Sequence, residues 1–183
     1  LGWGHFSTVW LAFNLSDKKI YALKILNSLK RFIQLISCIL LTMSVGGLSG
    51  FATIAGVNGW YTTLQKPSFN PPNYIFGPVW SLLYLLMGIS LALILDQEKS
   101  ENRSKAIKVF ALQLVLNFFW SIIFFNFHAI GWALIEIILM WLSILAMIVV
   151  SYRVNKPASL LQIPYICWVS FATLLNASIY YLN

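Results

Sequence analysis

The sequence predicts an all-α membrane protein, built as a bundle of five transmembrane helices. Of its 183 residues, 60% are hydrophobic and 9% are charged, which is too apolar for an ordinary soluble domain. Five apolar runs of about 20 residues are each long enough to cross a hydrocarbon core of about 30 Å as a helix. No water is available there to satisfy exposed backbone groups, and barrel strands need only about half that length, so helices are expected. The runs cover residues 32–54, 74–95, 106–127, 130–150 and 159–181.

The amino-terminal segment differs from the rest, and we divide the chain into residues 1–28 and 29–183. Strand-like residues flank a turn signal at residues 14–18. Gly2, Gly4, Ser7 and Val9 resemble the glycine-rich loop of protein kinases, and Ala22, Leu23 and Lys24 resemble the strand that carries the phosphate-pairing lysine. The sequence of the first dozen residues is most similar to the SR-protein kinase family. Nothing later resembles the H-R-D or D-F-G motifs that phosphoryl transfer needs. We therefore expect a non-functional fragment, left by a gene fusion or a mispredicted exon.

The first apolar run is interpreted as a mature helix. It is longer than the apolar region of a signal peptide, and four more runs follow it. Gly46 and Gly50 form a G-x-x-x-G pattern, which permits close backbone approach either between two copies or within the bundle. Cys38 in this run and Cys167 in the fifth run are interpreted as small apolar residues.

The connection at residues 55–73 is long for a helical hairpin. Pro67, Pro71 and Pro72 prevent it from forming a continuous helix. A rigid, aromatic-rich loop suits the covering of a cavity better than simple linkage. We therefore predict a proline-rich lid between the first and second helices, with a purely structural connection as the alternative.

Four of the predicted helices carry a face on which aromatic and polar side chains recur at helical spacing. These faces comprise Phe76, Trp80, Tyr84 and Met87 in the second run, Gln113, Asn117 and Trp120 in the third, Trp132 and Glu136 in the fourth, and Trp168, Ala172, Leu175 and Asn176 in the fifth. Any one of them could be an ordinary contact between helices, and Trp60 and Trp132 could be interfacial belt residues. Taken together with the lid, the set predicts a ligand pocket.

Ionisable residues give little sign of catalysis. Glu136 is the only acidic residue well inside a run, where a proton relay, exposure at the interface and a hydrogen bond to a neighbouring helix all remain open. His5 lies in the kinase-like segment and His128 in a tight turn. No cluster has metal-ligand spacing and no paired carboxylates suggest hydrolysis. We expect no catalytic residues, no metal and no cofactor.

The net charge of +7 reflects topology rather than nucleic-acid binding. Threading five spans places eleven of the twelve Lys and Arg residues on the face that carries the amino terminus: Lys18, Lys19, Lys24, Lys30, Arg31, Lys99, Arg103, Lys105, Lys108, Arg153 and Lys156. Lys66 alone falls on the other face. This side is predicted to be cytoplasmic if insertion follows the bacterial rule, with anionic lipid headgroups as a secondary contact.

Residues 60–87 read W-Y-T-T-L-Q-K-P-S-F-N-P-P-N-Y-I-F-G-P-V-W-S-L-L-Y-L-L-M. This stretch resembles the translocator protein (TspO) family, also called the peripheral benzodiazepine receptor family, and the likeness extends over residues 32–183. Further matching residues are Gln113, Asn117, Trp120, Phe124 and Phe125, then Gly131 to Leu134, then Pro164, Tyr165, Trp168, Phe171 to Thr173, Leu175 and Asn176. The resemblance implies a five-helix membrane protein, often a homodimer, that binds porphyrins, haem-related tetrapyrroles or cholesterol.

The resemblance also implies roles for particular residues. The connection caps the pocket, and the tryptophans at Trp80 and Trp168 line it and are implicated in light-dependent porphyrin breakdown in bacterial members. The ligand-binding residues expected are Tyr61, Pro71, Pro72, Trp80, Tyr84, Gln113, Asn117, Trp120, Trp132, Trp168, Ala172 and Leu175. The aromatic rings could stack on a planar macrocycle, while Gln113 and Asn117 could anchor its polar groups. No basic residue follows Tyr180, which leaves the proposed sterol motif incomplete and favours a tetrapyrrole.

The function expected is therefore that of an integral membrane receptor or sensor for porphyrin-type ligands, linked to tetrapyrrole regulation or disposal. A light-dependent porphyrin-degrading enzyme and a lipid or sterol transporter are the alternatives. The expected partners are the ligand, membrane lipids and a second copy of the chain, with no nucleic acid. The membrane expected is bacterial or the mitochondrial outer membrane.

Overall fold

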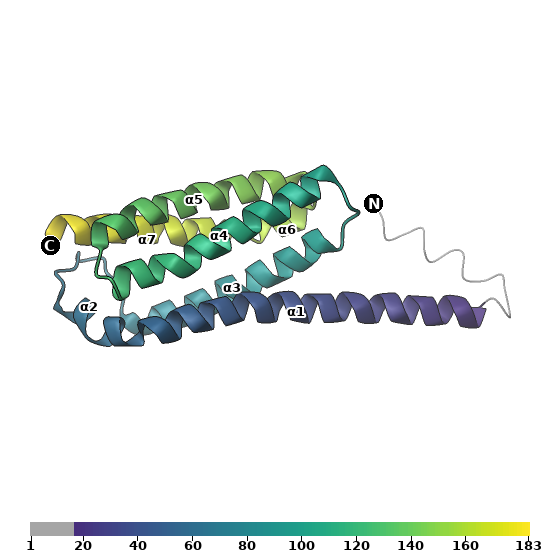
Figure 1. Cartoon of the computed structure of the whole chain (residues 1–183), viewed down its shortest axis with the longest axis horizontal. Coiled ribbons are helices and arrows are strands. Elements are labelled where there is room, and N and C mark those ends of the chain that lie inside the picture. The colour runs from purple at the N-terminus through teal and green to yellow at the C-terminus, as the bar shows by residue number, and fades with distance from the viewer. Residues whose placement is uncertain (1–16) are drawn as a thin grey trace.

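The computed structural model describes residues 17–183, with side chains from Lys24 onward, and these residues form a helical bundle (Figure 1). Five segments are long and apolar enough to span a membrane, which confirms the predicted fold class. The long helices are α1 (Asp17–Asn58), α3 (Asn73–Leu95), α4 (Glu101–Phe125), α5 (Ile130–Tyr152) and α7 (Ile163–Leu182). Two short helices, α2 (Trp60–Thr63) and α6 (Lys156–Leu160), lie in the connections before α3 and α7.

The long helices lie side by side, with α1 against α3 and α4, α4 against α5, and α5 against α7. The α2 connection, the α4–α5 turn and the carboxyl terminus lie at one end of the bundle (Figure 1). The α3–α4 and α5–α6 connections lie at the other end, beyond which the first turns of α1 project. The described Lys and Arg side chains other than Lys66 therefore gather at this second end, as the charge pattern predicted. Which end faces the cytoplasm stays a prediction.

The expectation of an extended conformation before residue 28 is wrong where the structure describes it, because α1 is already helical from Asp17. Ala22, Leu23 and Lys24 are good helix formers. Each residue added to an existing helix gains a backbone hydrogen bond without a new nucleation cost, so the transmembrane helix extends through them. The glycine-rich stretch of the kinase-like segment and His5 lie outside the described residues.

Capping residues set the helix ends that hydrophobicity placed only approximately. α4 begins at Glu101, five residues before the apolar run, because the Ser100 hydroxyl accepts the Arg103 backbone N–H at 3.2 Å. α6 begins where Asn155 accepts the Ala158 N–H at 3.0 Å. The α4–α5 turn contains His128 at a positive φ of 56°, as expected for a tight turn.

α1 and α3 pack closely at one level of the bundle. The Thr42 hydroxyl donates to the Tyr84 carbonyl at 2.8 Å, and a Cβ at Gly88 would lie 2.6 Å from the α1 backbone at Ile39. Gly46 lies against the Tyr84 ring. Of the two uses considered for the glycine pair, Gly46 thus serves packing within the bundle, whereas a Cβ at Gly50 would meet nothing within 4 Å.

Candidate ligand-binding cavity

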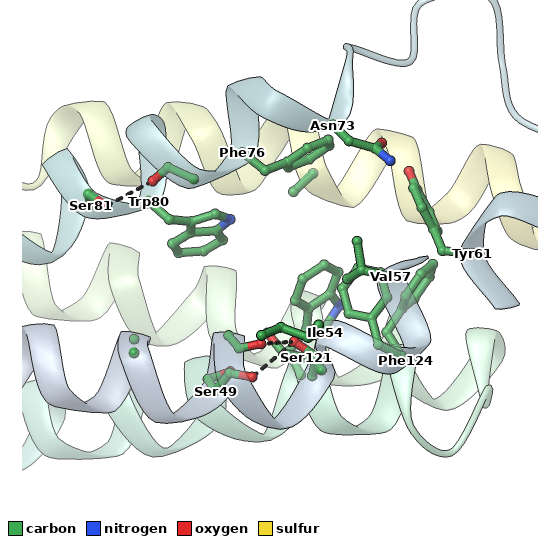
Figure 2. Close-up of a pocket in the computed structure, with 18 of the residues that line it drawn as sticks. Ser49, Ile54, Val57, Tyr61, Asn73, Phe76, Trp80, Ser81, Ser121 and Phe124 are labelled. Atoms are coloured by element: carbon green, nitrogen blue, oxygen red, sulfur yellow. Dashed lines mark hydrogen bonds between the residues drawn. The ribbon is translucent and has the colours of Figure 1, made fainter. Parts of the chain in front are cut away.

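A cavity of about 460 Å³ lies between α1, α3, α4 and α7, in the half of the bundle next to α2. Its volume falls in the range of small-molecule sites, about 300–1,000 Å³. The wall is rich in aromatic side chains, among them Phe76, Trp80, Tyr84, Trp120, Phe124 and Trp168, which three different helices contribute. Figure 2 shows Phe76 and Trp80 on α3 facing Ile54 and Val57 of α1 across the cavity.

Most residues expected in the pocket line this cavity. They are Tyr61 of α2, Trp80 and Tyr84 of α3, Trp120 of α4, and Trp168, Ala172 and Leu175 of α7. Asn176 and Phe76, which share helical faces with them, line it as well. Their helical spacing predicted that these residues share a face of each helix, and in the structure these faces surround one cavity.

Sequence reasoning missed the contribution of α1. Met43, Ser49, Thr53, Ile54 and Val57 line the cavity, as do three glycines of the same helix. α1 carries no tryptophan or amide in this stretch, so the search for mixed aromatic and polar faces passed over it. The G-x-x-x-G pattern of Gly46 and Gly50 predicts only packing or dimerisation.

Five expected residues do not line the cavity: Pro71, Pro72, Gln113, Asn117 and Trp132. Pro72 is the exposed residue that precedes α3. Trp132 is 71% exposed at the start of α5, which places it on the outside of the bundle, where the belt interpretation fits. Its side chain borders only a shallow groove with Tyr180.

Gln113 and Asn117 are fully buried behind the cavity wall instead, in a hydrogen-bonded network. The Tyr84 hydroxyl donates to Asn117 Oδ1, and Asn117 Nδ2 donates to the Tyr165 hydroxyl at 2.9 Å. The Tyr165 hydroxyl in turn donates to Gln113 Oε1 at 3.0 Å. Amide and hydroxyl groups of three helices thus satisfy each other in an apolar environment, which fixes the orientation of the Tyr84 ring in the wall. Neither amide lines the cavity.

The indole N–H groups of the wall differ in their partners. Trp120 Nε1 donates to Asn176 Oδ1 at 3.2 Å, and Asn176 Nδ2 donates to the Ile130 carbonyl at 3.1 Å. Trp168 Nε1 is buried and has no hydrogen-bond partner among the described residues. A buried indole usually finds an acceptor, so the N–H of Trp168 is an unsatisfied donor in a residue of the cavity wall.

Hydrogen bonds near its first and last residues hold the connection at residues 64–72 in place. The Tyr61 hydroxyl donates to Asn70 Oδ1 at 2.9 Å, and Gln65 exchanges two hydrogen bonds of 3.0 Å with the Asn183 side chain. Lys66 Nζ lies 4.4 Å from the centre of the Tyr61 ring. Burial raises the pKa of the Tyr61 phenol to about 12. The side chain that reaches the cavity from this region is that of Tyr61 on α2 rather than a proline.

Glu136 lies on α5 outside the cavity wall, is 8% exposed, and has no hydrogen-bond partner for either carboxylate oxygen among the described residues. The expectations of interface exposure or of a hydrogen bond to a neighbouring helix are therefore not met.

His128 stacks on Trp60 with ring centres 4.3 Å apart in the turn at the α2 end. Within residues 17–183, no three His, Cys, Asp or Glu side chains cluster as metal ligands would.

Five segments that are long and apolar enough to span a membrane, four of which surround the cavity, define a polytopic membrane protein with a candidate ligand site inside its bundle. The sequence places it more narrowly. The chain belongs to the TspO/MBR family, whose family model matches residues 38–182.

Similar proteins come from bacteria and mammals. "Tryptophan-rich protein TspO" of Chlorobaculum tepidum is 42% identical over 155 residues, which are 84% of this chain and 98% of that protein. "Translocator protein" of Homo sapiens is 40% identical over 120 residues, 64% of this chain and 70% of that protein. "Tryptophan-rich sensory protein" of Cereibacter sphaeroides is 33% identical over 124 residues, 68% of this chain and 77% of that protein.

Proposed function

We propose that the protein is an integral membrane receptor or sensor that binds porphyrin-type tetrapyrroles, or similar hydrophobic ligands, and takes part in tetrapyrrole regulation or disposal. The observation that carries this proposal is the aromatic cavity within the membrane-spanning part of the bundle. Membership in a family that includes a protein named as sensory supports it.

Ring geometry supports a flat, conjugated ligand. Trp80 and Tyr84 lie 5.7 Å apart with their planes 31° apart, and Trp120 and Phe124 lie 5.5 Å apart at 26°. A ligand already dissolved in lipid gains little from leaving it, so the usual burial term of about 25 cal/mol per Å² is largely absent. Ring stacking, worth about 0.5–1.5 kcal/mol per pair, and a few hydrogen bonds then decide which ligand binds. The Trp168 N–H, which has no partner among the described residues, is the proposed donor to a carbonyl or carboxylate oxygen of the ligand.

The connection after α2 is proposed to act as the lid of this cavity. Tyr61 reaches the cavity wall, and its hydrogen bond to Asn70 links it to the proline-rich stretch. Phe69 also packs edge-on against Phe171 of α7, with ring centres 6.3 Å apart. In this proposal Pro71 and Pro72 stiffen the lid.

Light-dependent porphyrin breakdown is the second candidate function. Trp80 and Trp168 are two of the three tryptophans that line the cavity, where an excited porphyrin would lie beside oxidisable rings. Product formed in light and lost when both tryptophans are replaced would favour this function. Net movement of ligand across a liposome membrane would favour transport of a lipid or sterol, the third candidate.

Membrane placement and assembly complete the proposal. The basic end of the bundle is proposed to face the cytoplasm, and the protein is proposed to form a homodimer in a bacterial or mitochondrial outer membrane. Relatives from bacteria and mammals support either membrane.

The direct test is a titration with protoporphyrin IX in the dark, following tryptophan fluorescence of the purified protein. We expect saturable quenching with micromolar affinity, weakened in a Trp80→Phe, Trp168→Phe double variant. The other six of the eight tryptophans still report in that variant. Linear quenching that is identical in both proteins would mean that the porphyrin only partitions into the micelle, and the tetrapyrrole proposal would be rejected.

A further inference from the structure

We infer that the ligand enters the cavity sideways from the hydrocarbon layer, through a gap between α1 and α3 bordered by Gly47, Gly50 and Gly77. This inference rests on the proposed function and narrows it, because a site filled in this way selects compounds that dissolve in the membrane.

The gap is indicated by residues that line the cavity and are exposed at the same time. Gly47 and Gly50 on α1, and Gly77 and Ser81 on α3, have both properties. Gly50 lies eight residues before the end of α1 at Asn58, roughly 12 Å at 1.5 Å per residue. Gly77 and Ser81 lie four and eight residues after the start of α3, roughly 6 Å and 12 Å into that helix. In a hydrocarbon core of about 30 Å, this depth faces the acyl chains.

These glycines differ from the others in the same helices. A Cβ on Gly46, Gly56 or Gly88 would collide with another helix, the usual reason for glycine between membrane helices. A Cβ on Gly47, Gly50 or Gly77 would meet no atom within 4 Å. Close packing therefore does not explain Gly47, Gly50 and Gly77. Their lack of a side chain leaves space between α1 and α3.

The boundaries of the gap fit an entrance. At one side the contacts of Gly46, Thr42 and Gly88 close α1 against α3. At the other side α2 covers the cavity with the buried Tyr61. Inside, Trp168 lines the cavity, and its N–H has no partner among the described residues and can donate to an arriving polar group.

A second route would run through the end of the bundle, where Asn58 and Asn73 line the cavity and are exposed. A membrane-dissolved ligand would have to pass through water to use it. Each 100 Å² of apolar surface exposed on that path costs about 2.5 kcal/mol, whereas the gap between α1 and α3 avoids the step. The energetics favour the lateral route.

The test compares binding rates in lipid nanodiscs. Protoporphyrin IX is mixed rapidly with the protein in the dark, and tryptophan quenching gives the association rate. Mixing loaded nanodiscs with excess protein-free vesicles gives the release rate. Protein-free nanodiscs, followed by porphyrin fluorescence, measure the partitioning step separately. The lateral variant is Gly47→Leu, Gly77→Leu, the end variant is Asn58→Leu, Asn73→Leu, and Ala52→Leu is an exposed α1 control outside the cavity wall.

We expect both rate constants of the lateral variant to fall by about tenfold while their ratio changes less than threefold, since a blocked path slows entry and exit alike. Ala52→Leu should keep the parent rates, and the end variant, whose two residues line the cavity, should slow entry and release much less than the lateral variant does. Parent-like rates in the lateral variant, or slowing only in the end variant, would overturn the lateral route while saturable binding upholds the proposed function. Absence of saturable binding in the parent would overturn both.

Discussion

Gly46 of α1 lies so close to the Tyr84 ring of α3 that a Cβ at position 46 would overlap the ring atoms. The adjacent Gly47 has open space around it. Two neighbouring glycines in one helix thus have opposite roles, one closing α1 against α3 and one leaving the cavity open beside them. Tyr84 connects this contact to the buried network, because its hydroxyl donates to Asn117.

Replacing Gly46 by leucine should destabilise the protein and weaken ligand binding, because the Tyr84 ring must move out of the cavity wall. Overpacked interiors typically lose about 1–3 kcal/mol. Thermal unfolding in detergent checks the stability, and the porphyrin titration checks the affinity. Gly47→Leu is the matched control and should unfold at the parent temperature; equal losses in the two variants would contradict the packing role of Gly46.

Replacing Asn117 by leucine should cost stability and affinity together, because it leaves the Tyr84 and Tyr165 hydroxyls without their shared partner. Hydrogen bonds between membrane helices contribute about 0.6–1.7 kcal/mol, and we expect a loss in that range. A double-mutant cycle with Tyr84→Phe measures the coupling. Additive effects of the two substitutions would show that the network does not orient Tyr84.

Trp168→Phe should weaken the binding of a carboxylate-bearing porphyrin by about fivefold, equivalent to about 1 kcal/mol, because the ring remains but the N–H donor is lost. Porphyrin dimethyl ester, a weaker acceptor, should lose less. The titrations are run in the dark for both ligands. Trp132→Phe serves as the control and should leave both affinities unchanged, since Trp132 lies on the outer face of α5.

The lid region should loosen at high pH. The pKa of the Tyr61 phenol is about 12 in the folded protein, against an ordinary value of 10.0, because burial disfavours the charged phenolate. Between these values the open form loses its proton first and binds fewer protons, so the stability of the closed lid falls as pH rises from about 10 toward 12 and is complete below pH 10.

A nitroxide on Ser68→Cys, with Cys38 and Cys167 replaced, reports the mobility of this connection. In the parent the mobility should increase over that pH range. Tyr61→Phe removes the titrating group, so its spectrum should stay constant there, although the lost hydrogen bond to Asn70 raises the mobility at neutral pH. A parallel pH response in both proteins would rule out Tyr61 as its source.

The helical faces of the second, third and fifth runs could be predicted because 3.6 residues per turn place Trp80 and Tyr84, or Trp168 and Ala172, on one side of a helix. Depth within the bundle could not. Gln113 and Asn117 share a helical face with Trp120, yet only Trp120 lines the cavity. Asn117 lies about one turn and Gln113 about two turns further from the α2 end, where Asn117 bonds to Tyr84 and Gln113 bonds to Tyr165. Trp132 has suitable spacing to Glu136 but turns outward.

The sequence by itself determined the number of membrane-spanning helices, the clustering of basic residues at one end and the family, since long apolar runs, charge placement and motifs are local properties of the chain. Local caps at Ser100 and Asn155, rather than hydrophobicity, set where α4 and α6 begin. Tertiary structure decided which helix faces meet around the cavity. It also gave α1 its role in the wall. Because glycine has no side chain, the sequence does not show whether a glycine packs against another helix. Gly46 contacts α3 and Gly47 has open space because of where the neighbouring helix lies.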